Sequence, residues 1–224
     1  MPEILLIDID GTLLDFNKCA RLSIIQGFRR HGLAYGEHVF ETFVRINDGL
    51  WLEIEKGTLT RKRLHEIRWN TIFSELGIDF DGVVFEKTFL EFLFDSHEHV
   101  DGADEILKYL SGKYTLCAAS NGIHLQQINR LTKAGMIGYF KNLFISEEMG
   151  TAKPAKEYFD ICFKRLGNPD KSKVMIIGDS LTADIAGGKN YGIKTLWYNP
   201  DGKIPGGIIP DYTVSALSEI KNIL

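Results

Sequence analysis

The chain has 224 residues, of which 44% are hydrophobic and 25% charged, and its formal net charge is -4. This length allows one large domain or a core with an insertion, and this composition is ordinary for a folded globular protein rather than a disordered one. The slight acidity provides no long-range attraction to nucleic acid or to an anionic membrane. Any recognition of a phosphate must therefore come from a local site.

Two features bear on the compartment. The cysteines Cys19, Cys117 and Cys162 are scattered, odd in number and without metal-ligand spacing, which predicts reduced packing residues. The apolar run at residues 4–7 is too short for a signal-peptide core, and no apolar run reaches the roughly 18 residues of a membrane span. We expect a cytoplasmic protein without a membrane or a nucleic-acid polymer as partner, and the sequence leaves its oligomeric state open.

The first predicted element is a buried strand over residues 4–7. It leads directly into Asp8-Ile9-Asp10-Gly11-Thr12. An apolar strand that ends in acidic side chains places them at its carboxyl end, where open α/β sheets build their active sites.

Residues 16–96 show helical periodicity but no convincing strand. Helices are expected over residues 18–31, 61–76 and 83–95, and the first two stop at Gly32 and Gly77, as helices commonly do. We interpret this stretch as an inserted α-helical cap domain, with residues 1–15 and 97–224 forming the core.

From residue 102 onward, helical and strand-like segments alternate. Strands are expected over residues 114–119, 143–146, 174–177 and 195–198, and helices over 103–110, 124–134, 155–166 and 182–191. A loop rich in proline and glycine follows at residues 199–210. The alternation predicts an α/β fold with a doubly wound parallel sheet, covered by helices on both faces.

Three polar motifs follow the later strands. They are Ser120-Asn121-Gly122, Lys153-Pro154, and Gly178-Asp179 with Asp184. Together with the first motif, and in this order, they resemble the haloacid dehalogenase (HAD) superfamily, specifically its aspartate-nucleophile phosphatases. The resemblance implies a HAD-like Rossmannoid core and Mg²⁺-dependent hydrolysis of phosphomonoesters through an aspartyl-phosphate.

Hydrolysis of a phosphate ester requires a nucleophile, a proton donor for the leaving oxygen and positive charge around the phosphoryl oxygens. We expect Asp8 to attack phosphorus. Asp10 would protonate the departing alkoxide and then take a proton from the water that hydrolyses the intermediate.

The phosphoryl group itself needs hydrogen-bond donors and a cation. Ser120 would bind one phosphoryl oxygen, together with the backbone N–H groups of Asn121 and Gly122 at the start of the next helix. Lys153 would neutralise the group being transferred, and Pro154 suits the first turn of the helix that follows.

Four carboxylates cannot converge without a cation, because two like charges a few ångströms apart repel by about 4 kcal/mol at an effective dielectric of 20. Hard oxygen ligands beside a phosphoryl group favour Mg²⁺. We expect its ligands to be Asp8, the backbone carbonyl of Asp10, and Asp179. The resemblance assigns Asp184 to ordering metal-bound water.

Each motif alone has an ordinary structural explanation, and their combination favours an enzyme. Dehalogenases of this superfamily generally lack the second aspartate of the first motif, so Asp10 favours a phosphatase. Bacterial receiver domains carry a similar acidic cluster but are far shorter and have no such helical insertion. A non-catalytic metabolite sensor is the least favoured alternative.

The cap narrows the resemblance. Residues 47–51, 55–60, 64, 68, 146–154 and 167–170 look like those of the YjjG-type pyrimidine 5'-nucleotidases, which implies pyrimidine nucleoside monophosphates as substrates. Trp51 would stack on a base, and Asn47 or Arg68 would read its polar edge. A role in the cap's own packing is the more ordinary explanation of all three. A phosphatase or phosphomutase for small sugar phosphates or phosphoglycolate is the alternative function.

Overall fold

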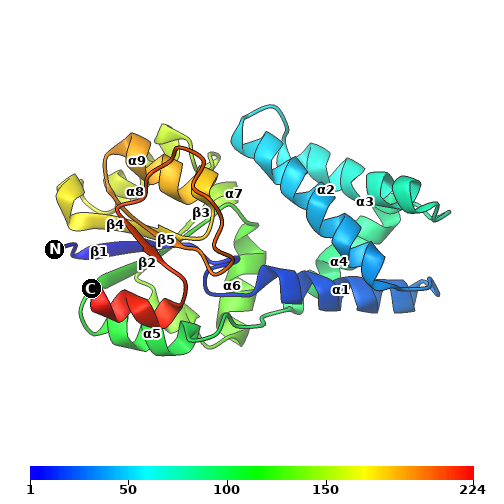
Figure 1. The fold of residues 1–224 in the computed structure, drawn as a ribbon, viewed down its shortest axis with the longest axis horizontal. Coiled ribbons are helices and arrows are strands. Elements are labelled where there is room, and N and C mark those ends of the chain that lie inside the picture. Colours follow the sequence, from blue (N-terminus) through cyan, green and yellow to red (C-terminus); the bar gives the residue numbers. More distant parts are fainter. The chain divides into compact units, whose positions relative to one another are not determined.

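The computed structural model describes all residues, 1–224, and divides them into two compact units (Figure 1). Met1–Asp15 and His97–Leu224 form one, which we call the core unit. Phe16–Ser96 forms the other, the cap unit. The cap unit is thus one continuous insertion in the sequence of the core unit.

The core unit is built on a six-stranded sheet in which every neighbouring pair of strands is parallel. The strand order is β3-β2-β1-β4-β5-β6. The strands are β1 (Ile4–Ile7), β2 (Thr115–Ser120), β3 (Asn142–Ile145), β4 (Val174–Gly178), β5 (Lys194–Tyr198) and β6 (Tyr212–Val214). From β1 the order runs through β2 and β3 on one side and through β4 on the other, so β1 and β4 flank the point where the topology reverses. Ligand sites of open α/β sheets form at this point.

Helices connect the strands of the core unit. The α-helices are α5 (Ala103–Ser111), α6 (His124–Lys133), α7 (Ser146–Met149), α8 (Lys156–Arg165) and α9 (Ala186–Tyr191). The π-helix η3 (Leu181–Ile185) precedes α9, and short 3₁₀ helices lie at η1 (Ile137–Tyr139), η2 (Lys171–Lys173) and η4 (Leu217–Asn222).

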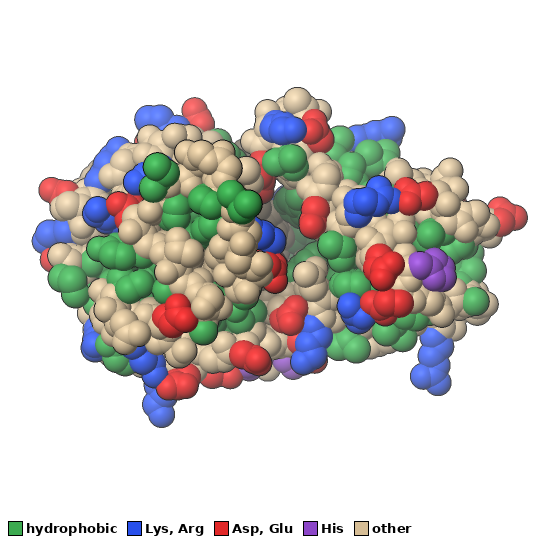
Figure 2. Space-filling view, viewed as in Figure 1, with side chains coloured by type: hydrophobic (Ala, Val, Ile, Leu, Met, Phe, Trp, Pro, Cys, Tyr) green, Lys and Arg blue, Asp and Glu red, His purple; other side chains and the backbone are tan.

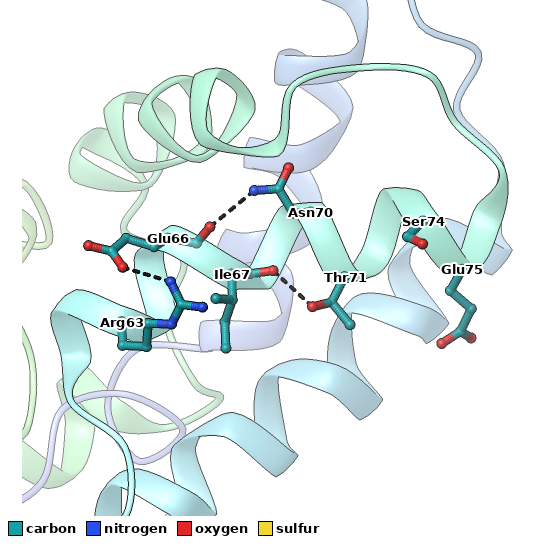
Figure 3. Close-up of a pocket in the computed structure, with 7 residues that line it drawn as sticks. All are labelled: Arg63, Glu66, Ile67, Asn70, Thr71, Ser74 and Glu75. Atoms are coloured by element: carbon teal, nitrogen blue, oxygen red, sulfur yellow. Dashed lines mark hydrogen bonds and ion pairs between the residues drawn. The ribbon is translucent and has the colours of Figure 1, made fainter.

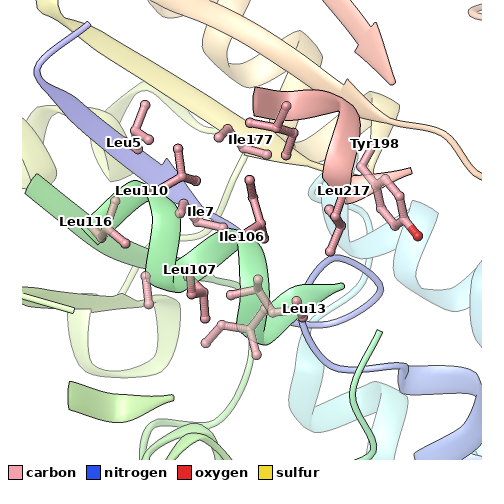
Figure 4. Close-up of a cluster of buried hydrophobic side chains, with 14 of the residues drawn as sticks. Leu5, Ile7, Leu13, Ile106, Leu107, Leu110, Leu116, Ile177, Tyr198 and Leu217 are labelled. Carbon is pink, nitrogen blue, oxygen red and sulfur yellow. The ribbon is translucent and has the colours of Figure 1, made fainter. Parts of the chain in front are cut away.

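Side chains of the sheet alternate between two hydrophobic clusters. Leu5 and Ile7 of β1 belong to the cluster that includes Ile106 of α5 and Leu217 of η4 (Figure 4). Leu6, between them, belongs to the cluster formed with α8 and Tyr191 of α9. Each fully buried aliphatic side chain contributes roughly 1.5–3 kcal/mol. Both faces of the sheet are covered, which confirms the doubly wound α/β fold.

The cap unit contains four helices, α1 (Phe16–Arg30), α2 (Glu37–Glu55), α3 (Arg61–Leu76) and α4 (Gly82–Asp95). Helix α3 packs on α2 and α4, and α1 packs on α4. Their shared core is rich in aromatic rings, with Trp69 of α3 and Phe85 of α4 only 4.3 Å apart between ring centroids. All the buried members of this cluster come from residues 19–93, so the cap unit has a hydrophobic core of its own.

The two chain segments that join the cap unit to the core unit run side by side within the core unit. The backbone N–H of Asp15 donates to the carbonyl of Glu98 at 2.8 Å, and that of Val100 donates to Leu13 at 2.9 Å. An antiparallel bridge pairs Leu14 with His99 between them. The insertion therefore starts and ends at one hydrogen-bonded point.

The surface mixes charges of both signs. On the face shown in Figure 2, lysine and arginine side chains are interspersed with carboxylates. No helix combines the length and the apolar character required to cross a membrane. The three cysteines are free and buried, as the sequence predicts.

Candidate active site

The polar motifs lie where three neighbouring strands end. Asp8 follows β1, Ser120 is the last residue of β2, and Asp179 follows β4. Strand β1 pairs with β2 on one side and with β4 on the other, all in parallel. The carboxyl ends of these strands therefore bring motifs more than 100 residues apart to one edge of the sheet.

Lys153 lies at the centre of this edge and is 2% exposed. Its Nζ donates to Asp8 Oδ1, to Asp184 Oδ1 and to the backbone oxygen of Ala119, each at 2.6 Å. Burial alone lowers the pKa of Lys153, but the carboxylates of Asp184 and Asp8 raise it more, so its pKa lies above the ordinary value. The site thus holds one fixed ammonium with all three N–H donors engaged.

Asn121 holds the backbone of Lys153 in place. Its side-chain Nδ2 donates to the Lys153 carbonyl and its Oδ1 accepts from the Lys153 N–H, both at 2.8 Å. The loop after β2 is thereby joined to the loop between α7 and α8. Beside it, the N–H of Gly122 donates to Ser120 Oγ at 3.0 Å, so the predicted phosphate-binding residues form one hydrogen-bonded turn.

Three acidic side chains converge on the same point. One carboxylate oxygen each from Asp8, Asp179 and Asp184 lies within 4.8 Å of the others. Burial raises the pKa of Asp8 well above its ordinary value and also raises that of Asp184, in both cases against the effect of Lys153. Burial and the charge of Asp184 raise the pKa of Asp179 to about 7.

The site also carries an excess of negative charge. When ionised, the three carboxylates carry three negative charges, and Lys153 compensates only one. The uncompensated charge equals that of one divalent cation, and all three donors are hard oxygen atoms of the kind Mg²⁺ prefers. The residues present therefore fit a Mg²⁺ ion.

Asp179 is fixed by the turn that follows β1. Gly11 has a φ of 84°, and a Cβ atom there would lie 2.4 Å from Asp179 Oδ2, so only glycine fits. Thr12 Oγ1 donates to Asp179 Oδ1 at 3.2 Å, and Trp197 Nε1 donates to the Asp179 backbone oxygen at 2.9 Å. Neither Thr12 nor Trp197 is among the site residues predicted from the sequence.

Asp184 is fully buried and lies within the acidic group itself. The helix expected over residues 182–191 begins instead with the π-helix η3, whose wider turn carries Asp184. Ser180 caps this helix by accepting from the N–H of Ala183 at 3.0 Å, and its own N–H donates to Asp184 Oδ2 at 3.2 Å. π-Helical turns frequently occur at functional sites.

Asp10 faces a different set of partners. Its Oδ1 accepts from Arg130 Nη1 and its Oδ2 from Gln127 Nε2, each at 2.5 Å. Its side chain is 29% exposed, so part of the carboxyl group remains open to solvent. Gln127 and Arg130 were not predicted as site residues; the available signal was two long polar side chains three residues apart on one helix.

Two of the three cap residues suggested as substrate contacts lie in the interior of the cap unit. Arg68 forms a bidentate ion pair with Glu86, with N–O distances of 2.6 and 3.2 Å, and its Nη1 donates to Asn47 Oδ1 at 2.8 Å. Asn47 and Arg68 are 3% and 2% exposed. They are therefore inter-helix contacts of the cap rather than substrate contacts. Trp51, on α2, is half-buried and stays a candidate.

A shallow hollow on the cap unit is lined by seven residues of α3 alone (Figure 3). Arg63 pairs with Glu66, and the side chains of Asn70 and Thr71 donate to carbonyls one turn earlier in the same helix. The Asn70 oxygen accepts from the Gly82 N–H of α4, so these polar groups bond to α3 and α4 rather than converging on a ligand. The hollow is not part of the candidate site.

Comparison with known proteins matches residues 2–192 to the family of haloacid dehalogenase-like hydrolases. The chain belongs to this family. It is accordingly an enzyme, a HAD-like hydrolase.

The relatives of this HAD-like hydrolase span nearly its whole length. It is 36% identical to YfnB of Bacillus subtilis, described as a HAD-hydrolase, over 98% of this chain and 94% of that protein. It is 35% identical to the pyrimidine 5'-nucleotidase PynA of Streptococcus pneumoniae (88% and 84% covered) and 32% identical to the pyrimidine 5'-nucleotidase YjjG of Escherichia coli (97% and 95% covered).

A solved structure of Bacillus subtilis YfnB has the same fold as this HAD-like hydrolase. The TM-score is 0.95, with all of this chain and 98% of that chain covered. YfnB is bound to magnesium in that structure.

Proposed function

We propose that this hydrolase is a Mg²⁺-dependent phosphomonoesterase that acts through an aspartyl-phosphate, with pyrimidine nucleoside 5'-monophosphates as its principal substrates. The observation that carries this proposal is the contact of 2.6 Å between Lys153 and Asp8 inside an otherwise acidic, buried site. A fixed cation beside a nucleophilic carboxylate is suited to a group that brings its own negative charge, as a phosphoryl group does.

In the first step, Asp8 attacks. Its Oδ1 is held by Lys153, which leaves Oδ2 as the attacking oxygen. As the bond from this oxygen to phosphorus forms, the bond from phosphorus to the ester oxygen breaks, and the carboxyl proton of Asp10 passes to that leaving oxygen. Ser120 binds a phosphoryl oxygen meanwhile, and the positive charge of Lys153, fixed beside Asp8, stabilises the negative charge of the phosphoryl group.

In the second step, water attacks the phosphorus of the aspartyl-phosphate. Asp10, now ionised, takes a proton from this water, the bond between phosphorus and Asp8 breaks, and inorganic phosphate leaves. The enzyme returns to its starting protonation state. The same carboxyl group thus serves as acid and then as base.

A Mg²⁺ ion would be held by Asp8, Asp179 and the backbone carbonyl of Asp10, with Asp184 beside them, and it would supply positive charge against the phosphoryl oxygens. Asp184 belongs to the same acidic group, since one of its carboxylate oxygens lies within 4.8 Å of those of Asp8 and Asp179.

The substrate class rests on the named activity of PynA and YjjG, which this chain matches over most of its length. In the cap unit, Trp51 is proposed to stack on the pyrimidine ring, because it lies outside the cap's hydrophobic core and is half-exposed.

The test is Mg²⁺-dependent release of phosphate from uridine, deoxyuridine and thymidine 5'-monophosphates, purine nucleotides, sugar phosphates and phosphoglycolate. We expect the three pyrimidine nucleotides to give the highest kcat/KM. Faster turnover of sugar phosphates or phosphoglycolate would reject the substrate class and keep the chemistry. Absence of turnover on every ester would reject the phosphatase and favour a metabolite sensor.

Replacing Asp179 with asparagine tests the metal site. Because the pKa of Asp179 is raised to about 7, the metal-free native state binds a proton that the unfolded state releases, and its stability falls as pH rises toward 7. Mg²⁺ should therefore raise the melting temperature more at a pH well above 7 than well below it. We expect Asp179→Asn to remove most of this Mg²⁺-induced stabilisation and to require more Mg²⁺ for activity. An unchanged Mg²⁺ dependence would exclude Asp179 as a ligand.

A further inference from the structure

Two buried polar residues of α6 contact the candidate site without any role in the mechanism above. Gln127 is fully buried and Arg130 is 1% exposed. They lie three residues apart, so their side chains share one face of the helix. Burying an amide and a guanidinium is unfavourable unless their donors are used, so their contacts have to account for their position.

The contacts form a closed network around Asp10. The amide nitrogen of Gln127 donates both to Asp10 Oδ2 at 2.5 Å and to Ser120 Oγ at 2.8 Å. Arg130 Nη1 contacts Asp10 Oδ1 at 2.5 Å and Gln127 Oε1 at 3.1 Å. One amide group therefore joins the carboxyl group of Asp10 to the hydroxyl group of Ser120, and Arg130 fixes both Asp10 and that amide.

The turn after β2 provides the space for this amide. A Cβ atom on Gly122 would lie 2.5 Å from Gln127 Nε2, which is closer than real atoms approach. The backbone of Gly122 has no positive φ, so alanine fits its conformation. Gly122→Ala would thus displace the Gln127 amide without removing any backbone N–H group.

We infer that Gln127 and Arg130 are positioning residues, which hold the carboxyl group of Asp10 at a fixed distance from the phosphoryl-binding Ser120 so that its proton reaches the leaving oxygen. This inference rests on the proposed function and deepens it. Both oxygens of Asp10 accept from side chains of α6, and the Asp10 side chain is still 29% exposed. A misplacement of about 1 Å costs catalysis up to roughly 10²-fold.

The test separates proton transfer from the other steps by changing the leaving group. An alkoxide, as in uridine 5'-monophosphate, needs a proton as it departs, whereas the 4-nitrophenolate of 4-nitrophenyl phosphate departs without one. We expect Gln127→Met to lower kcat/KM for the nucleotide by about 10- to 100-fold and for the aryl phosphate by less than about threefold. The parameter kcat/KM is chosen because it reports steps up to departure of the leaving group.

Two further variants make the test specific. Gly122→Ala should show the same preference for the aryl phosphate. If thermal unfolding and circular dichroism show that Gln127→Met does not fold, Gly122→Ala alone tests the inference. Gln126→Met is the control, since Gln126 is its neighbour in α6, is 8% exposed and is absent from the network. It should keep the wild-type ratio of the two kcat/KM values.

The outcomes separate a failure of this inference from a failure of the proposed phosphatase function. The inference is overturned if Gln127→Met and Gly122→Ala lose kcat/KM equally on both substrates or lose none. The network would then only link α6 structurally to the segment after β1. If the wild-type enzyme hydrolyses neither substrate, the proposed function fails, and the inference fails with it.

Discussion

Asp8→Asn is expected to abolish phosphate release, with a loss of about 10⁴-fold or more in kcat, as for other residues that form the covalent intermediate. The reason is that an amide is a far weaker nucleophile than a carboxylate. The Asp8 side chain lies at the centre of the site, 2.6 Å from Lys153. Steady-state phosphate release with saturating Mg²⁺ measures the effect.

The fold should survive this substitution. Burial raises the pKa of Asp8 well above its ordinary value, which means that its charge is unfavourable in the metal-free protein. We expect the melting temperature of Asp8→Asn without Mg²⁺ to equal or exceed that of the wild type. Asp201→Asn, on an exposed loop, is the matched control and should behave as wild type. Activity of Asp8→Asn within tenfold of wild type would remove Asp8 as the nucleophile.

Lys153→Met is expected to lower kcat by about 10²- to 10³-fold or more, because the developing anion loses the positive charge fixed beside it. It should also destabilise the metal-free protein. Removing one partner of a buried ion pair typically costs about 3–5 kcal/mol, and here Asp8 and Asp184 both lose their cation. Urea unfolding without Mg²⁺ measures the destabilisation.

The two effects of Lys153→Met should respond differently to conditions. Lower pH protonates the buried carboxyl groups, and Mg²⁺ compensates their charge, so either should recover part of the lost stability. Neither should restore turnover, because the phosphoryl group still lacks its ammonium. Lys156→Met, a nearby exposed lysine, is the control. Recovery of turnover by Mg²⁺ alone would show that Lys153 is needed only to hold the acidic residues together.

The sequence predicts the sheet well because its strands are buried on both faces. Continuous apolar runs such as residues 174–177 have no helical interpretation at that length, and the polar motifs that end them are visible without any three-dimensional information. Strand β6 escaped prediction, since it has three residues and two of them are exposed. Helix α2 also escaped prediction. It has no side-chain cap at Gly36, and its Asn47-Asp48-Gly49 segment has the composition of a turn.

Within the site, the residues that escaped prediction are those defined by distant partners. Gln127 and Arg130 meet Asp10 across 117 and 120 residues of sequence, and their spacing of three residues on one helix does not show that Asp10 is their partner. For Arg68, the sequence allows a substrate contact or a role in the cap's packing, and the structure shows the second. Its true partner, Glu86, lies 18 residues away on another helix, and only the packing of α3 on α4 brings them together.

The way in which the cap is inserted has a consequence for how such enzymes diversify. The chain leaves and re-enters the core unit through paired segments, where Asp15 bonds to Glu98 and Leu14 bridges to His99. Everything between them is contiguous and packs around its own aromatic core. A different helical cassette spliced between these two segments would leave all the strand-end carboxylates in place, because insertions are best tolerated where the chain ends lie close together. The core unit and the cap unit are thus encoded in separable stretches of the gene, and each can change while the other is kept.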